Sequence, residues 1–129
     1  MSVPSSGRRT PRQRLGTAIE RLVAHHLEAQ GYTLLARNWR CAYGELDLVA
    51  EREGVVIFFE VRARRSETFG TPEESLTPRK RAALIAAAQA FLAERGLEAS
   101  AWQIDLVAVV LDARGRVARL THIPCAVEE

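Results

Sequence analysis

The sequence predicts a single α/β domain in which a mixed β-sheet lies between helices, in the order α-β-β-β-α-β with a further edge strand. Three patterns predict it. Residues 11–30 carry apolar side chains at helical spacing, residues 32–61 hold apolar runs of strand length, and residues 78–95 form an alanine-rich helical segment before an apolar strand. The chain has 129 residues, of which 47% are hydrophobic, so it is long enough for one core and too short for two domains.

The first helix is expected over residues 11–30, because Thr10 can cap its start, Pro11 suits its first turn and Gly31 can end it. Its apolar stripe is predicted to consist of Leu15, Ile19, Leu22 and His26, flanked by Ala18 and Val23. A glycine inside a helix costs about 1 kcal/mol relative to alanine, so Gly16 predicts the close approach of another backbone. Periodicity alone makes Glu20 an exposed residue at the edge of the stripe.

Three strands are expected next, over residues 32–40, around the apolar run 46–50 and over 55–61. Residues 51–54 are polar and end in glycine, so they predict the turn of a β-hairpin. One register of this hairpin places Asp47 opposite Glu60. A slip of one residue would send these two carboxylates to opposite faces of the sheet.

Acidic side chains occur on both strands of this hairpin. Glu45 and Asp47 share one face of their strand, and Glu60 and Arg62 share one face of the next, because side chains alternate along a strand. In the favourable register three carboxylates converge, and they repel one another unless a cation or a proton lies among them. Oxygen ligands with room for water suit Mg²⁺ or Mn²⁺ better than Zn²⁺.

The second half of the chain predicts a polar loop after residue 65, a helix over residues 78–95 and strands over 101–111 and 116–123. Asp105 is an acid within an apolar strand, and a buried acid needs a partner. We expect it to pair with an arginine, or else to join the edge of the acidic site. The domain is expected to span residues 11–125, with a basic flexible arm over 1–10 and a tail over 126–129.

Basic residues are unevenly distributed. Four arginines precede residue 15 without any acid, whereas the whole chain has a net charge of only +2. A basic arm on a near-neutral body fits a polyanionic partner, and it fits a solvated tail equally well. The candidate nucleic-acid contacts are Arg12, Arg14, Arg64 and Arg65, of which the last two lead into the polar loop.

The sequence also bears on location. No apolar run approaches the roughly 20 residues of a membrane span, and the first ten residues lack the apolar core of a signal peptide. Cys41 and Cys125 are far apart and lack the spacing of a zinc site. These features predict a soluble cytoplasmic protein with reduced thiols and no membrane partner.

An acid-x-acid pattern on one strand, followed by Glu-x-(Lys or Arg) on the next, resembles the PD-(D/E)xK nuclease superfamily and its restriction-endonuclease-like fold. The chain looks more closely like the YraN-like family of small bacterial proteins. The matching positions are Gly44 to Leu48, Phe59 to Arg64 and Glu20 with Ala24, together with Gly31, Tyr32, Asn38 and Lys80. The resemblance covers residues 15–110. Family members are similar to archaeal Holliday junction resolvases, which are dimeric and metal-dependent, so the resemblance extends to DNA as a partner and to a homodimer.

The resemblance implies that Asp47 and Glu60 bind Mg²⁺ or Mn²⁺, helped by the backbone carbonyl of Val61. Glu20 would be a supporting acid that reaches the metal through water, and Glu45 a neighbouring carboxylate without a defined role. The implied reaction is in-line attack of water on a phosphodiester bond. The metal would lower the pKa of the water and neutralise phosphate charge.

Arg62 departs from the family pattern, which has lysine at this position. A desolvated lysine can lose its proton and act as a base, whereas arginine keeps its proton. Arg62 can still orient water or balance phosphate charge. Lys80 is the one lysine of the chain, against 17 arginines, so either a general drift from lysine to arginine included this position or the chemistry has lapsed. Our hypothesis is that Lys80 supplies the missing ammonium.

Three functions follow from the sequence. The first is a metal-dependent nuclease that acts on structured or branched DNA, because no segment has the pattern of a base-reading helix. The second is a nucleic-acid-binding module of the same fold that has lost or weakened its activity. The third is a structural ion-pair network of the same acids and arginines, without a nucleic-acid partner.

Overall fold

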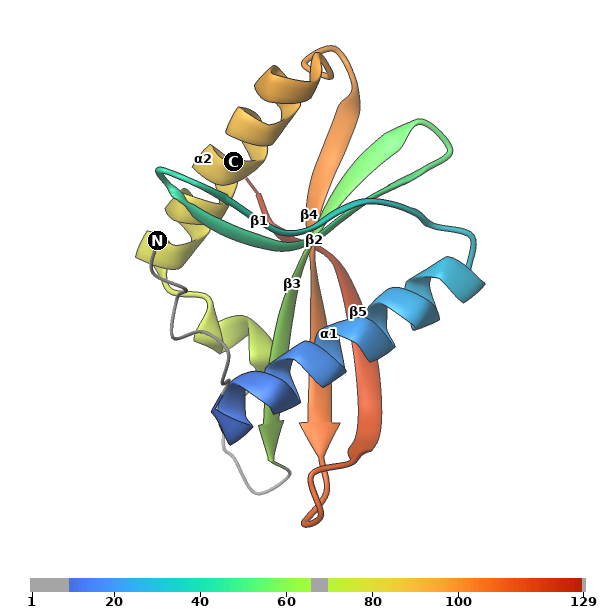
Figure 1. The fold of residues 1–129 in the computed structure, drawn as a ribbon. Coiled ribbons are helices and arrows are strands. Elements are labelled where there is room, and N and C mark those ends of the chain that lie inside the picture. The colour runs from blue at the N-terminus through green and yellow to red at the C-terminus, as the bar shows by residue number, and fades with distance from the viewer. Residues whose placement is uncertain (1–9, 66–69, 129) are drawn as a thin grey trace, which may run out of the picture.

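Two long helices and a sheet follow the order predicted from the sequence (Figure 1). The computed structural model describes residues 10–65 and 70–128. Its elements are α1 (Pro11–Ala29), β1 (Thr33–Cys41), β2 (Gly44–Arg52), β3 (Val55–Arg65), the short 3₁₀ helix η2 (Pro72–Ser75), α2 (Pro78–Arg95), β4 (Ala101–Leu111) and β5 (Val117–Val127). The α/β class is therefore confirmed. Residues 1–9 of the predicted basic arm lie outside the described residues, as does residue 129.

The strands within the described residues form one mixed sheet in the order β1-β2-β3-β4-β5. Successive strands from β1 to β3 pair antiparallel, β4 runs parallel to β3, and β5 pairs antiparallel with β4. The parallel pair needs a long crossover connection, which α2 provides. Hairpins join the remaining neighbours, so the sheet is mixed.

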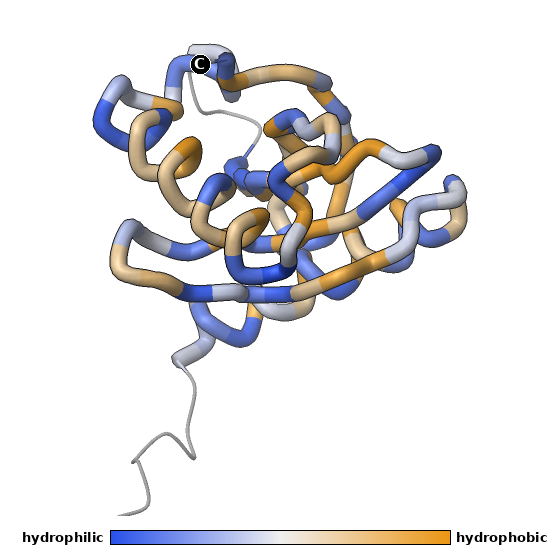
Figure 2. The backbone as a smooth tube through the Cα atoms, turned by 90° about the horizontal axis from the view of Figure 1, so that it is seen from above, coloured by the Kyte–Doolittle hydropathy of each residue, from blue (hydrophilic) through white to orange (hydrophobic). Residues whose placement is uncertain are grey.

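Each face of the sheet carries part of the hydrophobic core. On one face Phe58 of β3 packs with Phe91 of α2, and we call this the α2 side. On the opposite face Phe59 of β3 packs in one cluster with Val23 of α1, which we call the α1 side. β4 is buried on both faces, as its apolar composition predicts. Figure 2 shows hydrophobic residues along the strands and helices, interspersed with hydrophilic ones.

Both long helices begin at the predicted caps. The Thr10 hydroxyl accepts a hydrogen bond of 3.1 Å from the Gln13 amide, and the Gln13 side chain accepts one of 2.9 Å from the Thr10 amide. The Thr77 hydroxyl accepts a hydrogen bond of 3.2 Å from the Lys80 amide at the start of α2. α2 ends at Gly96, whose φ of 67° is left-handed. Among the described residues, neither long helix is apolar enough along its length to cross a membrane.

The predicted apolar stripe of α1 is wrong in part. Ile19, Val23, Ala24 and Leu27 are the buried residues of this helix, whereas Leu22 is 44% exposed. The buried positions 19, 23 and 27 advance in steps of four residues, which rotates the contact face away from Leu22. Ala24 also faces the sheet, because the position of a residue along the helix determines which side of the helix it lies on, whatever the size of its side chain.

The predicted backbone contact at Gly16 is also wrong. A Cβ built at this position would meet no heavy atom within 4 Å among the described residues. The neighbouring helices and strands therefore do not require a glycine here.

Replacement of Gly16 with alanine is expected to raise the free energy of unfolding by about 0.5–1 kcal/mol, because alanine has the higher helix propensity and finds free space. Urea denaturation followed by circular dichroism measures this difference. Ala18 is exposed on the same helix, and its replacement with glycine should lower stability by a similar amount. A loss of stability in the Gly16→Ala protein would contradict the open environment of this position.

The predicted pairing of Asp105 with an arginine is wrong. It is 1% exposed, and its Oδ2 lies 2.6 Å from Nε2 of His122 on β5. Its Oδ1 accepts hydrogen bonds of 2.9 Å from the Gln103 side chain and from the backbone amide of Cys125. β5 continues to Val127, beyond the predicted end at residue 123, and its register shifts beside Asp105. The buried carboxylate thus replaces a strand acceptor where the ladder is interrupted.

Candidate functional site

The register of the β2–β3 hairpin is the one that brings the acids together. Leu48 pairs with Phe59, and the pairing continues regularly to Arg52 and Val55 at the turn. One residue before Leu48, the Oδ2 atom of Asp47 accepts a hydrogen bond of 2.9 Å from the Val61 amide. A carboxylate therefore takes the place of a backbone acceptor between the two strands, and this contact fixes the Asp47 side chain.

Asp47 and Glu60 lie on the same face of the sheet. Val49 of β2 and Phe58 of β3 pack on the α2 side, and alternation places the side chains two residues away from each on that side as well. Glu60 is only 5% exposed. The two acids thus lie close together in a partly buried position, beside Lys80 in the first turn of α2.

The electrostatics of Asp47 show how close the two acids are. Burial, followed by the charge of Glu60, is the largest cause that raises the pKa of Asp47 from 3.8 to about 7. The charge of Glu45 and a hydrogen bond with the Glu60 carboxyl group also raise this pKa, whereas the hydrogen bond from the Val61 amide lowers it. Near neutral pH Asp47 is therefore partly protonated, and Glu60 lies within hydrogen-bonding distance of it.

Two cations approach Glu60 from different elements. Nε of Arg62 on β3 lies 3.0 Å from Glu60 Oε2, and Nζ of Lys80 on α2 lies 3.6 Å from the same oxygen. The Arg62 contact is one of charge only, since its buried Nε atom has no hydrogen-bond partner of suitable geometry. Lys80 reaches this oxygen because Pro78 and the Thr77 cap start α2 just beside the site.

The charge of Glu45 contributes to the raised pKa of Asp47, and Glu45 also belongs to an adjoining cluster of polar side chains. With its amide nitrogen turned toward the acids, Asn38 of β1 donates hydrogen bonds of 3.0 Å to Glu20 and 3.2 Å to Glu45. Arg40 lies 3.8 Å from Glu45 and is largely exposed. Glu20 is therefore partly buried and attached to the rim of the site, rather than simply exposed as periodicity predicts.

Asn38 is the site residue that reasoning from strand faces missed. Its φ of 49° is left-handed, and asparagine is among the few residues that tolerate this conformation. An asparagine at the end of a predicted strand, before acids on the next strand, is the signal that could have found it. Asn38 joins α1, β1 and β2, so it positions Glu20 and Glu45 together.

The described residues contain no group of three or more His, Cys, Asp or Glu side chains arranged as a complete metal site. Two adjacent carboxylates nevertheless fit Mg²⁺ or Mn²⁺, because such a cation can offset their negative charge and keep several water ligands. Asp47 and Glu60 are the residues that would hold it. The Val61 backbone is adjacent through its amide, and the role of its carbonyl stays a prediction.

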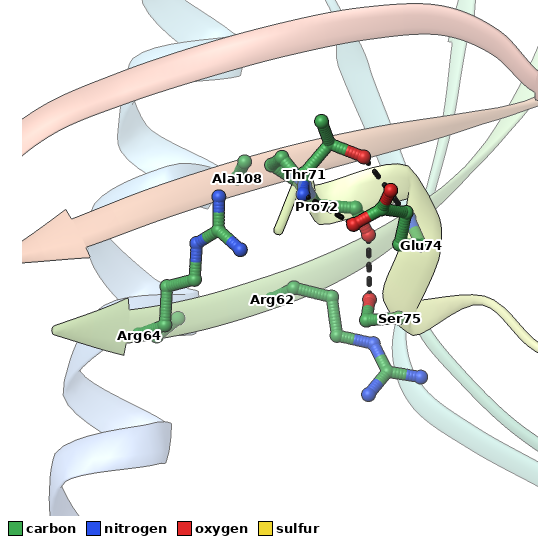
Figure 3. Close-up of a pocket in the computed structure, with 8 residues that line it drawn as sticks. Arg62, Arg64, Thr71, Pro72, Glu74, Ser75 and Ala108 are labelled. Carbon is green, nitrogen blue, oxygen red and sulfur yellow. Dashed lines mark hydrogen bonds between the residues drawn. The ribbon is translucent and has the colours of Figure 1, made fainter. Parts of the chain in front are cut away.

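A cavity of about 330 Å³ lies beside Arg62 and is lined by β3, β4 and η2. Arg62 and Arg64 extend into this region from β3, and their guanidinium groups point in different directions (Figure 3). Glu74 of η2 accepts a hydrogen bond of 2.8 Å from the Thr71 amide, so its carboxylate is occupied by the helix cap. Arg65 and Arg14 are exposed, and the side chain of Arg12 lies outside the described part of the structure.

The fold and the paired acids describe a small α/β protein with a polar site between its second and third strands. The chain belongs to the uncharacterised protein family UPF0102, whose model matches residues 19–109. It is similar to the UPF0102 protein of Roseiflexus castenholzii, with 47% identity over 125 residues that cover 96% of this chain and 98% of the relative. The UPF0102 protein of Moorella thermoacetica is 46% identical, over 83% of this chain and 89% of the relative. That of Myxococcus xanthus is 40% identical, over 89% and 90%.

Proposed function

We propose that the protein is a divalent-metal-dependent nuclease of the PD-(D/E)xK type that hydrolyses phosphodiester bonds in structured or branched DNA. The observation that carries this proposal is the contact between the Asp47 and Glu60 carboxyl groups, with Glu60 buried and Lys80 and Arg62 beside it. Paired acids can hold a divalent cation, and neighbouring cations can balance the charge that develops on a phosphate. The resemblance of the motif residues to the nuclease superfamily supports the same reaction, and it is the basis for DNA and a homodimer as partners.

In this mechanism Asp47 and Glu60 hold Mg²⁺ or Mn²⁺, with the carbonyl of Val61 as a further ligand. The cation, when bound, acts as a Lewis acid that lowers the pKa of water and neutralises phosphate charge. The Val61 amide keeps Asp47 in place through its 2.9 Å hydrogen bond. Asn38 orients Glu45 and Glu20 at the rim, where Glu20 can hold water.

In this proposal the two roles of the single lysine in the family pattern, charge balance and proton transfer, belong to Arg62 and Lys80. Arg62 keeps its proton, so its part is to balance negative charge that develops on the phosphate. Lys80 has a side chain that can release and take up a proton, and its Nζ lies 3.6 Å from Glu60. Proton transfer to or from the attacking water is therefore assigned to Lys80 in this proposal.

A second candidate function is a nucleic-acid-binding module without turnover. The observation that favours it is the 3.0 Å contact between Arg62 and Glu60, since a guanidinium at this position competes with a cation for the same carboxylate. In that case the arginines of β3 would bind phosphates and the acids would serve only to position them.

A cleavage assay separates the two candidates. Purified protein is incubated with duplex, single-stranded and four-way-junction DNA, with Mg²⁺, with Mn²⁺ or with EDTA. The nuclease proposal predicts metal-dependent cleavage that is lost in the Asp47→Ala protein and kept in the Glu28→Gln protein, which removes an exposed acid of α1. A salt-dependent shift of DNA mobility without cleavage would support the binding module instead.

A further inference from the structure

The start of α1 lies near the end of β3 (Figure 1). A groove of about 600 Å³ lies between them, on the other side of the sheet from the paired acids. Its apolar floor includes Leu15 and Ile19 of α1 and Ala63 of β3. Arg64 and Arg65 form its charged rim, and the described lining residues include no acid. A groove with an apolar floor and a purely cationic rim is complementary to a sugar–phosphate chain.

Gly16 also lines this groove. It lies inside α1, where glycine costs about 1 kcal/mol relative to alanine, and the described residues place no heavy atom within 4 Å of a Cβ built there. Packing among the described residues therefore does not explain the missing side chain. An external backbone that approaches the helix closely would explain it.

Arg64 lines both this groove and the cavity beside Arg62, so the two hollows lie near each other at the end of β3. Arg62 in turn lies 3.0 Å from Glu60 of the acidic site. Glu60 and Arg65 are five residues apart on β3, which corresponds to roughly 17 Å of extended chain. Alternation places Arg62 and Arg64 on one face of the strand and Arg65 on the other. The end of β3 thus carries positive charge on both faces of the sheet.

We propose that this groove binds the sugar–phosphate backbone of the DNA duplex that flanks the phosphodiester bond at the acidic site. The inference rests on the proposed function and adds a second contact region to it. Arg64 and Arg65 bind phosphates of the flanking segment, and Gly16 allows the backbone to lie against α1. The bound DNA therefore passes around the end of β3 from the α2 side to the α1 side.

Filling the groove tests this proposal. Gly16→Leu adds a side chain inside the groove, and Ala18→Leu adds the same side chain at an exposed position of the same helix. Binding of labelled duplex DNA is measured in EDTA, where no cleavage occurs, and circular dichroism confirms that each protein is folded. We expect Gly16→Leu to weaken binding by about tenfold or more and Ala18→Leu to leave it unchanged.

Salt dependence provides a second measurement. Arg65→Ala is expected to reduce the slope of log K against log salt by about 0.9, the value for one lost phosphate contact. Arg95→Ala makes the same change of charge at the far end of α2 and is expected to leave the slope unchanged. If Gly16→Leu and Ala18→Leu bind DNA with equal affinity, or if the two arginine variants have the same salt slope, DNA does not bind in the groove. Binding and cleavage by the wild-type protein would still support the proposed function. Failure of the wild-type protein to bind and cleave DNA would instead overturn the proposed function and the groove together.

Discussion

Replacing Asp47 with asparagine is expected to abolish metal-dependent cleavage and, at the same time, to stabilise the fold above neutral pH. Asparagine can accept the hydrogen bond from the Val61 amide as Asp47 does, and its amide can donate a hydrogen bond to Glu60. It cannot supply the negative charge that a cation needs. We expect cleavage to fall by about a thousandfold or more.

The stability effect has a definite sign. The pKa of Asp47 is 3.8 in its ordinary state and about 7 in the folded protein, so between these values the folded state binds a proton that the unfolded state does not. This stabilising contribution is complete below about pH 4 and is lost as the pH rises through about 7. Asparagine is uncharged throughout, so it mimics the protonated acid and avoids the loss.

Urea denaturation of the two proteins near pH 5.5 and near pH 8 measures this effect. At the higher pH we expect Asp47→Asn to be more stable by about 1–2 kcal/mol, less than half of the roughly 4 kcal/mol that the pKa difference alone would give, since the side chain is partly exposed to water. At the lower pH the difference should be about half as large, because the loss grows between the two pKa values and vanishes only below about pH 4. Mg²⁺ should stabilise the wild-type protein at pH 8 and have less effect on the variant.

The exposed residue Glu28 provides the control, because Glu28→Gln removes one charge from α1 and touches neither acid. Its stability should follow that of the wild-type protein at both pH values. An Asp47→Asn protein that shows the wild-type pH dependence would mean that the two carboxyl groups do not lie as close together as the raised pKa of Asp47 indicates. The metal proposal would then lose the observation on which it depends.

The paired acids could be predicted from the sequence because their position follows from local rules. Residues 51–54 define a short turn, and alternation around it places Asp47 and Glu60 together in only one register. The buried strand partners Leu48 and Phe59 favour that register because both would otherwise leave the core. The pattern of apolar residues in this hairpin thus determines which side chains lie opposite one another.

The contacts of Asn38 and Asp105 could not be predicted in this way. Asn38 connects Glu20 and Glu45 across three elements. Its left-handed backbone conformation depends on the complete sheet, so the local sequence does not predict it. Asp105 meets His122 through an interruption of the β4–β5 ladder. A register shift of this kind depends on packing between strands far apart in sequence, so a count of alternating residues does not reveal it.

Gly16 shows a different limit. The sequence marks it as an unusual residue for a helix interior, but the predicted approach of another backbone is not found among the described residues. A glycine in a helix has the same pattern in a sequence whether or not its surroundings are crowded. Coordinates are needed to show how much of the surrounding space the described residues occupy.

Lys80 gives the second large effect. Its Nζ and the Nε of Arg62 lie 3.6 and 3.0 Å from the same Glu60 oxygen, so the two side chains can exchange roles without movement of the backbone. Lys80→Arg keeps the positive charge and removes the side chain that can transfer a proton. We expect its cleavage rate to fall by about a hundredfold, the usual value of one acid–base group, while its affinity for DNA in EDTA is unchanged.

The exchange variant, Arg62→Lys combined with Lys80→Arg, distinguishes proton transfer from mere charge. The wild-type protein and the exchange variant carry the same two side chains beside Glu60, at exchanged positions. If only the charge matters, the exchange variant should cleave DNA no faster than Lys80→Arg alone. If an ammonium beside Glu60 is what the reaction needs, then lysine at position 62 should recover a large part of the lost rate. Arg79→Lys, an exposed change one residue from Lys80, should leave the rate as it is. Wild-type cleavage by Lys80→Arg would remove proton transfer by Lys80 from the proposal and leave only the positive charges at positions 62 and 80 to act on the phosphate.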